Sequence, residues 1–156
     1  MKYIWRDYVP EKAEYIELWL DDYAIRMTGL DDGWKSFFEY WKNEDNITLN
    51  ENYWCKIIFD GDVPFGVVAL SVWDESFNIM ELLVDPNLRG QGRGTGLLQE
   101  LIENGDKILG RSITNAEAVI YPKNIASQKA FENVGFTFDH ASDDGDALYY
   151  ILKRGG

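Results

Sequence analysis

An apolar run at residues 79–84 is separated from a stretch with helical periodicity by a turn with four glycines at alternate positions: Gly90, Gly92, Gly94 and Gly96. Glycine lacks a Cβ atom, so such a turn can adopt positive φ values and approach a ligand closely. The N–H groups at the start of the following helix converge, and the helix dipole favours an anion there. Arg89 and Arg93 add positive charge to this turn. The segment therefore predicts a strand, a phosphate-binding loop and a helix.

Two common phosphate-binding motifs do not fit this loop. The P-loop needs a Lys followed by Ser or Thr after its glycines, and no such pair is present. The dinucleotide motif G-x-G-x-x-G fails from Gly90, where the last position is Thr95, and from Gly92, where it is Leu97. The loop also lies past the middle of the chain, whereas a Rossmann fingerprint follows the first strand. Neither ATP nor NAD is therefore the expected ligand.

The hydrophobic pattern predicts a mixed α/β (α+β) fold around one central mixed sheet. The expected strands cover residues 2–8, 53–59, 64–73, 77–84, 116–121, 136–140 and 147–153. Helices are expected from Pro10, after Gly33, from the glycine loop through Leu109, and at residues 125–133, with residues 23–30 irregular. The order is β-α-α-β-β-β-α-β-α-β-β. No linker or repeat interrupts the chain, which predicts a single domain over residues 1–156.

Charge and composition exclude several classes of protein. The formal net charge is −12, and this surplus disfavours nucleic acid as a partner. No apolar run is long enough for a membrane span, and no secretory signal is visible, so we expect a cytoplasmic protein that does not bind membranes. Cys55 is the sole cysteine, so we expect a core residue, no intrachain disulfide and no metal site.

Two sequence blocks resemble the Gcn5-related N-acetyltransferases (GNAT), which bind acetyl-CoA. Arg89-x-x-Gly92-x-Gly94, with the lead-in Leu83-Val84-Asp85-Pro86, is similar to the family's R/Q-x-x-G-x-G/A pyrophosphate loop. Residues 124–136 are similar to its N-x-x-A/S-x-x-x-Y-x-x-x-G-F block. The order of elements fits along essentially the whole chain. The resemblance implies one GNAT acetyltransferase domain, with acetyl-CoA as co-substrate and no metal.

The resemblance also implies which residues bind the cofactor. The pyrophosphate would lie on the backbone amides of the loop, with Arg89 and Gly90 shaping its entry; these amides belong to Gln91, Gly92, Arg93, Gly94, Thr95 and Gly96. In the family the strand before the loop diverges from the next strand. The backbone of Leu83 and Val84 would then pair with the pantetheine arm, and one N–H would polarise the thioester carbonyl. Asn124 and Ser127 would face the same arm, although Asn124 serves equally well as a helix cap.

The catalytic residues are less clearly marked. Glu81 occupies a position where several family members place a general base, and its alternative is a solvent-facing strand residue. Phe131 stands where many members carry the Tyr that protonates the departing sulfur. Phe has no exchangeable proton, so the thiolate leaves unaided or receives a proton from water or Tyr121; Phe131 itself is expected to pack against the cofactor arm and the core. Asp85 is interpreted as a turn residue and His140 as a surface residue.

The acceptor is expected to be cationic. Residues 11–51 hold eleven Asp or Glu against four Lys or Arg, among dense aromatic residues, and the last hairpin adds Asp139, Asp143, Asp144 and Asp146. Such a wall suits a small amine that is aminoglycoside-, polyamine- or amino-acid-like, and an ordinary acidic face over an aromatic core explains it equally well. The predicted function is acetyl transfer to a primary amine. Acetylation of proteins or peptides and a non-catalytic CoA-binding module are the alternatives, and a homodimer stays open.

Overall fold

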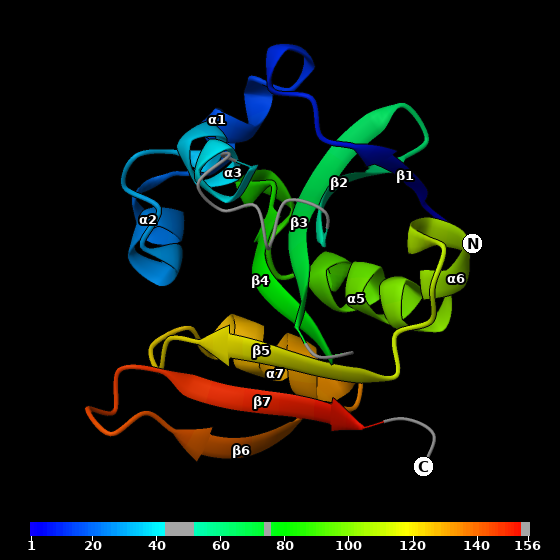
Figure 1. Cartoon of the computed structure of the whole chain (residues 1–156). Coiled ribbons are helices and arrows are strands. Elements are labelled where there is room, and N and C mark those ends of the chain that lie inside the picture. Colours follow the sequence, from blue (N-terminus) through cyan, green and yellow to red (C-terminus); the bar gives the residue numbers. More distant parts are fainter. Residues whose placement is uncertain (43–51, 74–75, 154–156) are drawn as a thin grey trace.

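The computed structural model of the chain describes residues 1–42, 52–73 and 76–153, and contains a seven-stranded sheet (Figure 1). The strand order is β1-β2-β3-β4-β5-β7-β6. Adjacent strands are antiparallel except β4 and β5, which are parallel. This arrangement confirms the predicted mixed sheet. The strands are β1 (Ile4–Asp7), β2 (Tyr53–Asp60), β3 (Val63–Trp73), β4 (Ser76–Val84), β5 (Asn115–Ile120), β6 (Thr137–Ala141) and β7 (Leu148–Lys153).

Helices cover both faces of the sheet. Val68 and Leu70 of β3 pack in a core with α5 and α7, while Val67 and Ala69 face a second core with α1, α2 and α3. No helix of the described residues is long and apolar enough to cross a membrane. The α-helices are α1 (Tyr15–Trp19), α2 (Asp22–Thr28), α3 (Trp34–Lys42), α5 (Arg93–Glu103), α6 (Gly105–Leu109) and α7 (Ile125–Asn133), and the 3-10 turns are η1 (Pro10–Lys12) and η3 (Pro86–Leu88).

The expectation of an irregular segment at residues 23–30 is wrong, because α2 occupies most of it. Asp21 caps the helix by accepting a hydrogen bond from the N–H of Ala24 at 2.9 Å. Gly29 ends it with a φ of +75°, a left-handed conformation that glycine adopts at little cost. The helix expected from Pro10 is also divided, into η1 and α1.

The single helix expected from the glycine loop through Leu109 is two helices, α5 and α6. The chain leaves helical geometry at Asn104, whose side-chain amide donates to the carbonyl of Glu100. Gly105 then lies so close to the following loop that a Cβ there would be 3.1 Å from the carbonyl oxygen of Arg111. This close approach lets α6 turn back toward β5.

A buried carboxylate attaches the first strand to α5. Glu100 is 8% exposed and accepts hydrogen bonds from the backbone N–H groups of Lys2 and Tyr3 and from the indole of Trp5, at 2.8 to 3.1 Å for the shortest contacts. These donors satisfy a charge whose burial would otherwise be costly. Glu100 therefore holds β1 against the helix that follows the glycine loop.

Candidate active site

The parallel strands β4 and β5 diverge in the middle of the sheet. Their pairing joins Phe77 to Ile79 with Ala116 to Ala118, and no pair is formed beyond Ile79 within the described residues. The register of β3 and β4 shifts opposite this point, between Ala69 and Leu70. Such a bulge bends a strand and increases its twist. The second half of β4 therefore leaves β5 and borders a gap on that side.

The backbone groups that face this gap follow from the β3–β4 ladder. The N–H of Asp85 donates to the carbonyl of Phe65 at 2.8 Å. Along an antiparallel ladder, residue pairs alternate between hydrogen-bonded and non-hydrogen-bonded. Leu83 therefore also directs its backbone N–H and C=O groups to β3, whereas Leu82 and Val84 direct theirs to the gap. Of the two residues expected to offer their backbone there, Val84 faces the gap and Leu83 does not, and Leu82 faces it in addition.

The glycine loop forms the start of α5. Gly90 and Gly92 both have a φ of +76°, which explains the need for glycine at these two positions. The first backbone bond of the helix runs from the N–H of Gly96 to the carbonyl of Gly92, at 2.9 Å. The N–H of Gly96 is therefore engaged in the helix, contrary to its predicted role at the pyrophosphate. A Cβ there would lie 3.2 Å from the Tyr3 hydroxyl, so this glycine permits α5 to pack on the N-terminal segment.

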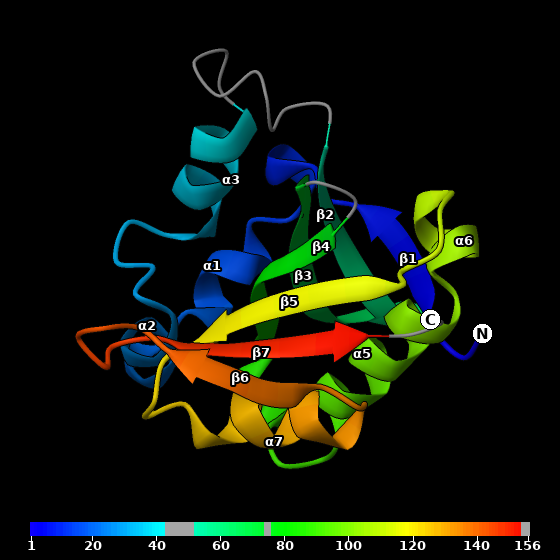
Figure 2. The same ribbon diagram turned by 60° about the horizontal axis from the view of Figure 1, so that its bottom comes forward.

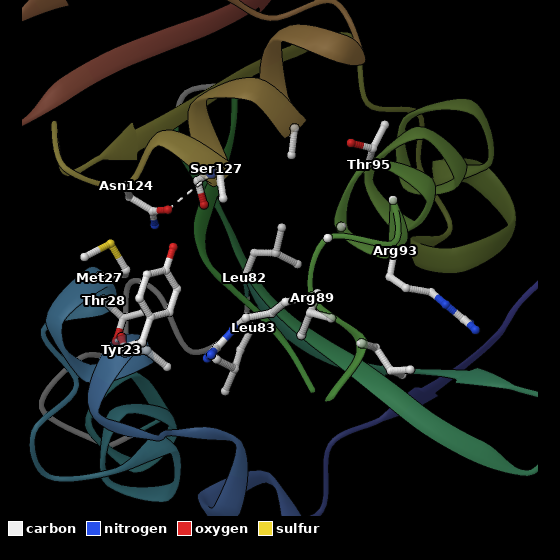
Figure 3. A pocket seen from close by; sticks show the side chains of 18 residues that line it. Tyr23, Met27, Thr28, Leu82, Leu83, Arg89, Arg93, Thr95, Asn124 and Ser127 are labelled. Atoms are coloured by element: carbon white, nitrogen blue, oxygen red, sulfur yellow. Dashed lines mark hydrogen bonds between the residues drawn. The ribbon is translucent and has the colours of Figure 1, made fainter. Parts of the chain in front are cut away.

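Both arginines of the loop pair with carboxylates from distant segments. Arg89 forms a two-pronged ion pair with Asp21, at 2.7 and 2.9 Å, and lowers the pKa of that carboxyl to about 2. Arg93 points away from the cavity in Figure 3 and donates to Asp60 at 2.7 Å. The anion-binding capacity of the loop therefore comes chiefly from the N–H groups at the start of α5.

A cavity of about 290 Å³ lies between the glycine loop, β4, α7 and α2 (Figure 3). Most of the predicted cofactor-binding residues line it: Leu83, Val84, Arg89, Gly90, Gly92, Arg93, Gly94, Thr95, Asn124 and Ser127. Gln91, Gly96 and Phe131 do not line this cavity. The sequence interpretation missed the α2 wall, formed by Tyr23, Ala24, Met27 and Thr28. Asp21 before this segment and Gly29 after it are the start and stop signals that could have revealed it.

A second cavity of about 210 Å³ adjoins the first at the divergence of β4 and β5, and the two share Met27, Thr28, Leu82, Asn124 and Ser127. Glu81 lines it and is partly buried, and burial raises the pKa of its carboxyl to about 8, opposed by the N–H of Leu82. Tyr121 lines the same cavity and lies against α2, since a Cβ at Gly29 would be 2.8 Å from its hydroxyl. The cavity thus places one titratable carboxyl at the split.

Phe131 also lines the second cavity. It is 3% exposed and packs edge-to-face on Phe136, with ring centroids 5.0 Å apart. This placement agrees with the expected packing in the core. Asn124 caps α7 by accepting from the N–H of Ser127 at 3.2 Å, and Figure 3 shows its amide nitrogen directed into the cavity. The capping role and a ligand-binding role for Asn124 are therefore compatible.

The remaining candidate residues lie outside the two cavities. Cys55 is buried in the second core, and burial raises the pKa of its thiol to about 12. Asp85 accepts from the N–H of Asn87 and caps the η3 turn, as expected for a turn residue. His140 is exposed, pairs with Asp139 and stacks on Tyr149. The described residues hold no group of three or more His, Cys, Asp or Glu side chains placed to bind a metal.

The proposed carboxylate-and-aromatic wall is only partly present. Most of the aromatic side chains of residues 11–42 belong to the second core: Tyr15, Trp19, Trp34, Phe37, Phe38 and Trp41. Tyr23 alone among the aromatics of residues 11–42 lines a cavity at the glycine loop or the split, and residues 43–51 lie outside the described residues. The turn between β6 and β7, with three of the acids, lies at the same end of the molecule as α2 and the end of β5 (Figures 1 and 2).

Comparisons with known proteins agree with this geometry. A sequence model of the acetyltransferase (GNAT) family matches residues 10–136. A crystal structure of the aminoglycoside acetyltransferase AAC(6')-Ib with coenzyme A is 19% identical, with a TM-score of 0.73, over 97% of this chain and 95% of that one. Spermidine N-acetyltransferase from Vibrio cholerae, in complex with CoA and spermine, is 14% identical, with a TM-score of 0.72 over 97% and 95%.

A third similar structure is the N-acetyltransferase PseH of Campylobacter jejuni, with 18% identity and a TM-score of 0.68 over 99% of this chain and 100% of that one. A comparison with curated proteins gave no match. The fold and the site together define an N-acetyltransferase. Because the family model covers most of its residues, the chain belongs to the GNAT acetyltransferase family.

Proposed function

We propose that the protein transfers the acetyl group of acetyl-CoA to a primary amine of a small cationic molecule. The observation that carries this proposal is the continuity of two cavities. The first has the anion-binding start of α5, and the second, at the split between β4 and β5, contains Glu81. Acetyl-CoA supplies the activated acetyl group, and the chain supplies a binding surface that leads from a phosphate site to a buried carboxyl.

The residues present fit the cofactor in four respects. The N–H groups of residues 92–95 precede the first backbone bond of α5, so they can donate hydrogen bonds to the oxygens of the diphosphate. Leu82 and Val84 present backbone groups to the gap, where they can pair with the amides of the pantetheine arm. Asn124 directs its amide nitrogen into the same cavity. A Cβ at Gly92 would meet no atom within 4 Å, which leaves room for a ligand there.

Glu81 is the proposed general base. It takes a proton from the acceptor ammonium, the neutral nitrogen then forms its bond to the acetyl carbon, and the carbon–sulfur bond breaks. The second nitrogen proton passes to solvent. Phe131 offers no proton to the leaving sulfur, so the thiolate departs without a donor at this position. A free thiol has a pKa of about 8.5, which makes its thiolate a fair leaving group.

The acceptor class rests on charge and on likeness. Glu81 lies in the second cavity, the acidic turn between β6 and β7 lies at the same end of the molecule, and the net charge of −12 attracts cations. Similar structures were solved with kanamycin and with spermine, both polyamines by chemistry. Acetylation of a protein or peptide amine, and CoA binding without catalysis, are the competing functions.

The test combines turnover with cofactor binding. Acetyl-CoA is incubated with aminoglycosides, polyamines, amino acids and short peptides, and free thiol is detected. We expect turnover with a polyamine or aminoglycoside. A preference for peptides would instead support acetylation of a protein or peptide amine. CoA binding without any turnover would support a non-catalytic CoA-binding protein. In thermal-shift assays Gly92→Asp should abolish the stabilisation by CoA. Gly110→Asp is the matched control, because Gly110 also has a positive φ, of +78°, and open space around it.

A further inference from the structure

The α2 wall of the first cavity is held to the glycine loop by three side chains. Asp21 pairs with Arg89 through both carboxylate oxygens, and the guanidinium lies over the Tyr23 ring, 4.5 Å from its centroid. A two-pronged pair restricts the position of the guanidinium, and the attraction between the cation and the ring holds the ring beside it. Tyr23 is therefore held by contacts on one side, although it is 38% exposed.

Asp21 has two structural roles that can be separated. Its side chain accepts the N–H of Ala24 and so begins α2, and it also binds Arg89, 68 residues away in the sequence. Asn caps a helix about as well as Asp does, but it cannot form the ion pair. A substitution of Asp21 by Asn therefore removes the charge and one of the two prongs of the pair with Arg89, because an amide nitrogen cannot accept from the guanidinium, while retaining the start of the helix.

Tyr23 is directed across the cavity. Figure 3 shows its ring on the α2 side, with the hydroxyl pointing toward the α7 side where Asn124 and Ser127 lie. Leu82, whose backbone faces the gap, lines the cavity between them. A chain that passes from the start of α5 to the split would run between the phenol and these residues. The pantetheine arm of CoA is a chain of this kind, and its amide groups could pair with the backbone of Leu82.

We propose that Tyr23 is a cofactor-contacting residue that covers the pantetheine arm, and that Asp21 is a positioning residue which acts through Arg89 to hold it there. This inference rests on the proposed function, because it requires CoA in the first cavity. It assigns to α2 a role in cofactor binding in addition to forming one side of the second cavity. It also gives Arg89 a task other than direct binding of the diphosphate.

The experiment measures dissociation constants by calorimetry for two probes. One is CoA, and the other is adenosine 3′-phosphate 5′-diphosphate, the fragment of CoA that lacks the pantetheine arm. Tyr23→Leu should raise the dissociation constant of CoA by about tenfold, and Tyr23→Phe and Asp21→Asn should raise it by about threefold each. The dissociation constant of the fragment should change by less than about twofold in all three variants. Asp21→Glu should restore most of the lost affinity. Asp22→Asn is the matched control, since it removes the same charge from the neighbouring exposed residue and should change neither constant.

The outcomes separate the possible failures. Equal weakening of CoA and the fragment would mean that the variants damage the glycine loop, and would overturn the proposal. Unchanged CoA affinity in Tyr23→Leu would show that the ring does not touch the arm. Wild-type protein that binds neither probe would refute the proposed function itself. Thermal unfolding of each variant without ligand verifies that it is folded. If Tyr23→Leu does not fold, Tyr23→Phe still tests the proposal, because it retains the ring and removes only the hydroxyl.

Discussion

The raised pKa of Glu81 makes the proposed base testable through pH. Burial moves the pKa of this carboxyl from 4.5 to about 8, so about one tenth of it is ionised at pH 7 and about nine tenths at pH 9. Removal of a general base by Glu81→Gln typically lowers the rate by about 10²-fold or more. We therefore expect the ratio of kcat/KM between wild type and Glu81→Gln to rise about tenfold from pH 7 to pH 9, and then to level off.

The assay follows free thiol from acetyl-CoA with one acceptor amine between pH 6 and 9.5. Taking the ratio of the two proteins cancels the ionisation of the amine, which contributes equally to both profiles. CoA affinity is measured beside it and should be the same in wild type and Glu81→Gln. A ratio that stays constant across this range would refute the base role of Glu81, whatever its absolute value.

The same shift predicts a change in stability of known sign. Between pH 4.5 and about 8 the unfolded chain ionises Glu81 while the folded protein keeps it protonated, so the free energy of unfolding falls as pH rises through this window. Gln does not titrate. The melting temperature of Glu81→Gln relative to wild type should therefore increase from pH 5 to pH 8 and stay constant above it. A difference that is flat over this window would show that the carboxyl is not desolvated in the folded state.

Three further substitutions test particular contacts. Phe131→Tyr should raise kcat at saturating acetyl-CoA, because it places a proton donor in the second cavity; equal values from pH 6 to 9 would show that proton delivery to sulfur does not limit turnover. Glu100→Gln should lower the free energy of unfolding by about 1–3 kcal/mol in urea, since it sets an amide against buried N–H donors, whereas Glu103→Gln on the exposed side should have little effect. Gly33→Ala should lower the melting temperature more than Gly61→Ala: both have positive φ, but only at Gly33 would the Cβ meet a carboxylate, at 2.6 Å. Equal losses would show that this carboxylate moves aside at no cost.

Local signals in the sequence were sufficient for most of the fold. The strands predicted at residues 53–59 and 64–73 correspond to β2 and β3, and the helix predicted at residues 125–133 has the bounds of α7. The α2 segment failed because its apolar residues do not form a continuous stripe, and because its start and stop depend on one carboxylate and one glycine. The break at Asn104 coincides with the dipeptide Asn104-Gly105, a local turn signal that the prediction of one helix through Leu109 overlooked.

The candidate site was predictable where it depends on the local spacing of glycines, and unpredictable where it depends on the register between strands or on where a helix begins. Glycine spacing alone indicated the loop at Gly90 and Gly92. The side to which Leu83 directs its backbone depends on the register with β3, which a single strand does not reveal. The number of free N–H groups at a helix start likewise depends on where its first bond forms, and this removed Gly96 from the predicted set.

The charges of the loop arginines explain how a strongly acidic chain can offer an anion site without relying on free cations. Asp21 and Asp60 each lie within 2.7 Å of one guanidinium, so the two arginines contribute little net charge at the cavity. They instead connect α2 and the β2–β3 turn to the loop, and so restrict the backbone whose N–H groups face the ligand. An amide cradle fixed in this way loses little conformational entropy when it binds an anion. We therefore expect its selectivity to come from the direction of its N–H groups, which the two left-handed glycines set and the ion pairs of Arg89 and Arg93 keep in place.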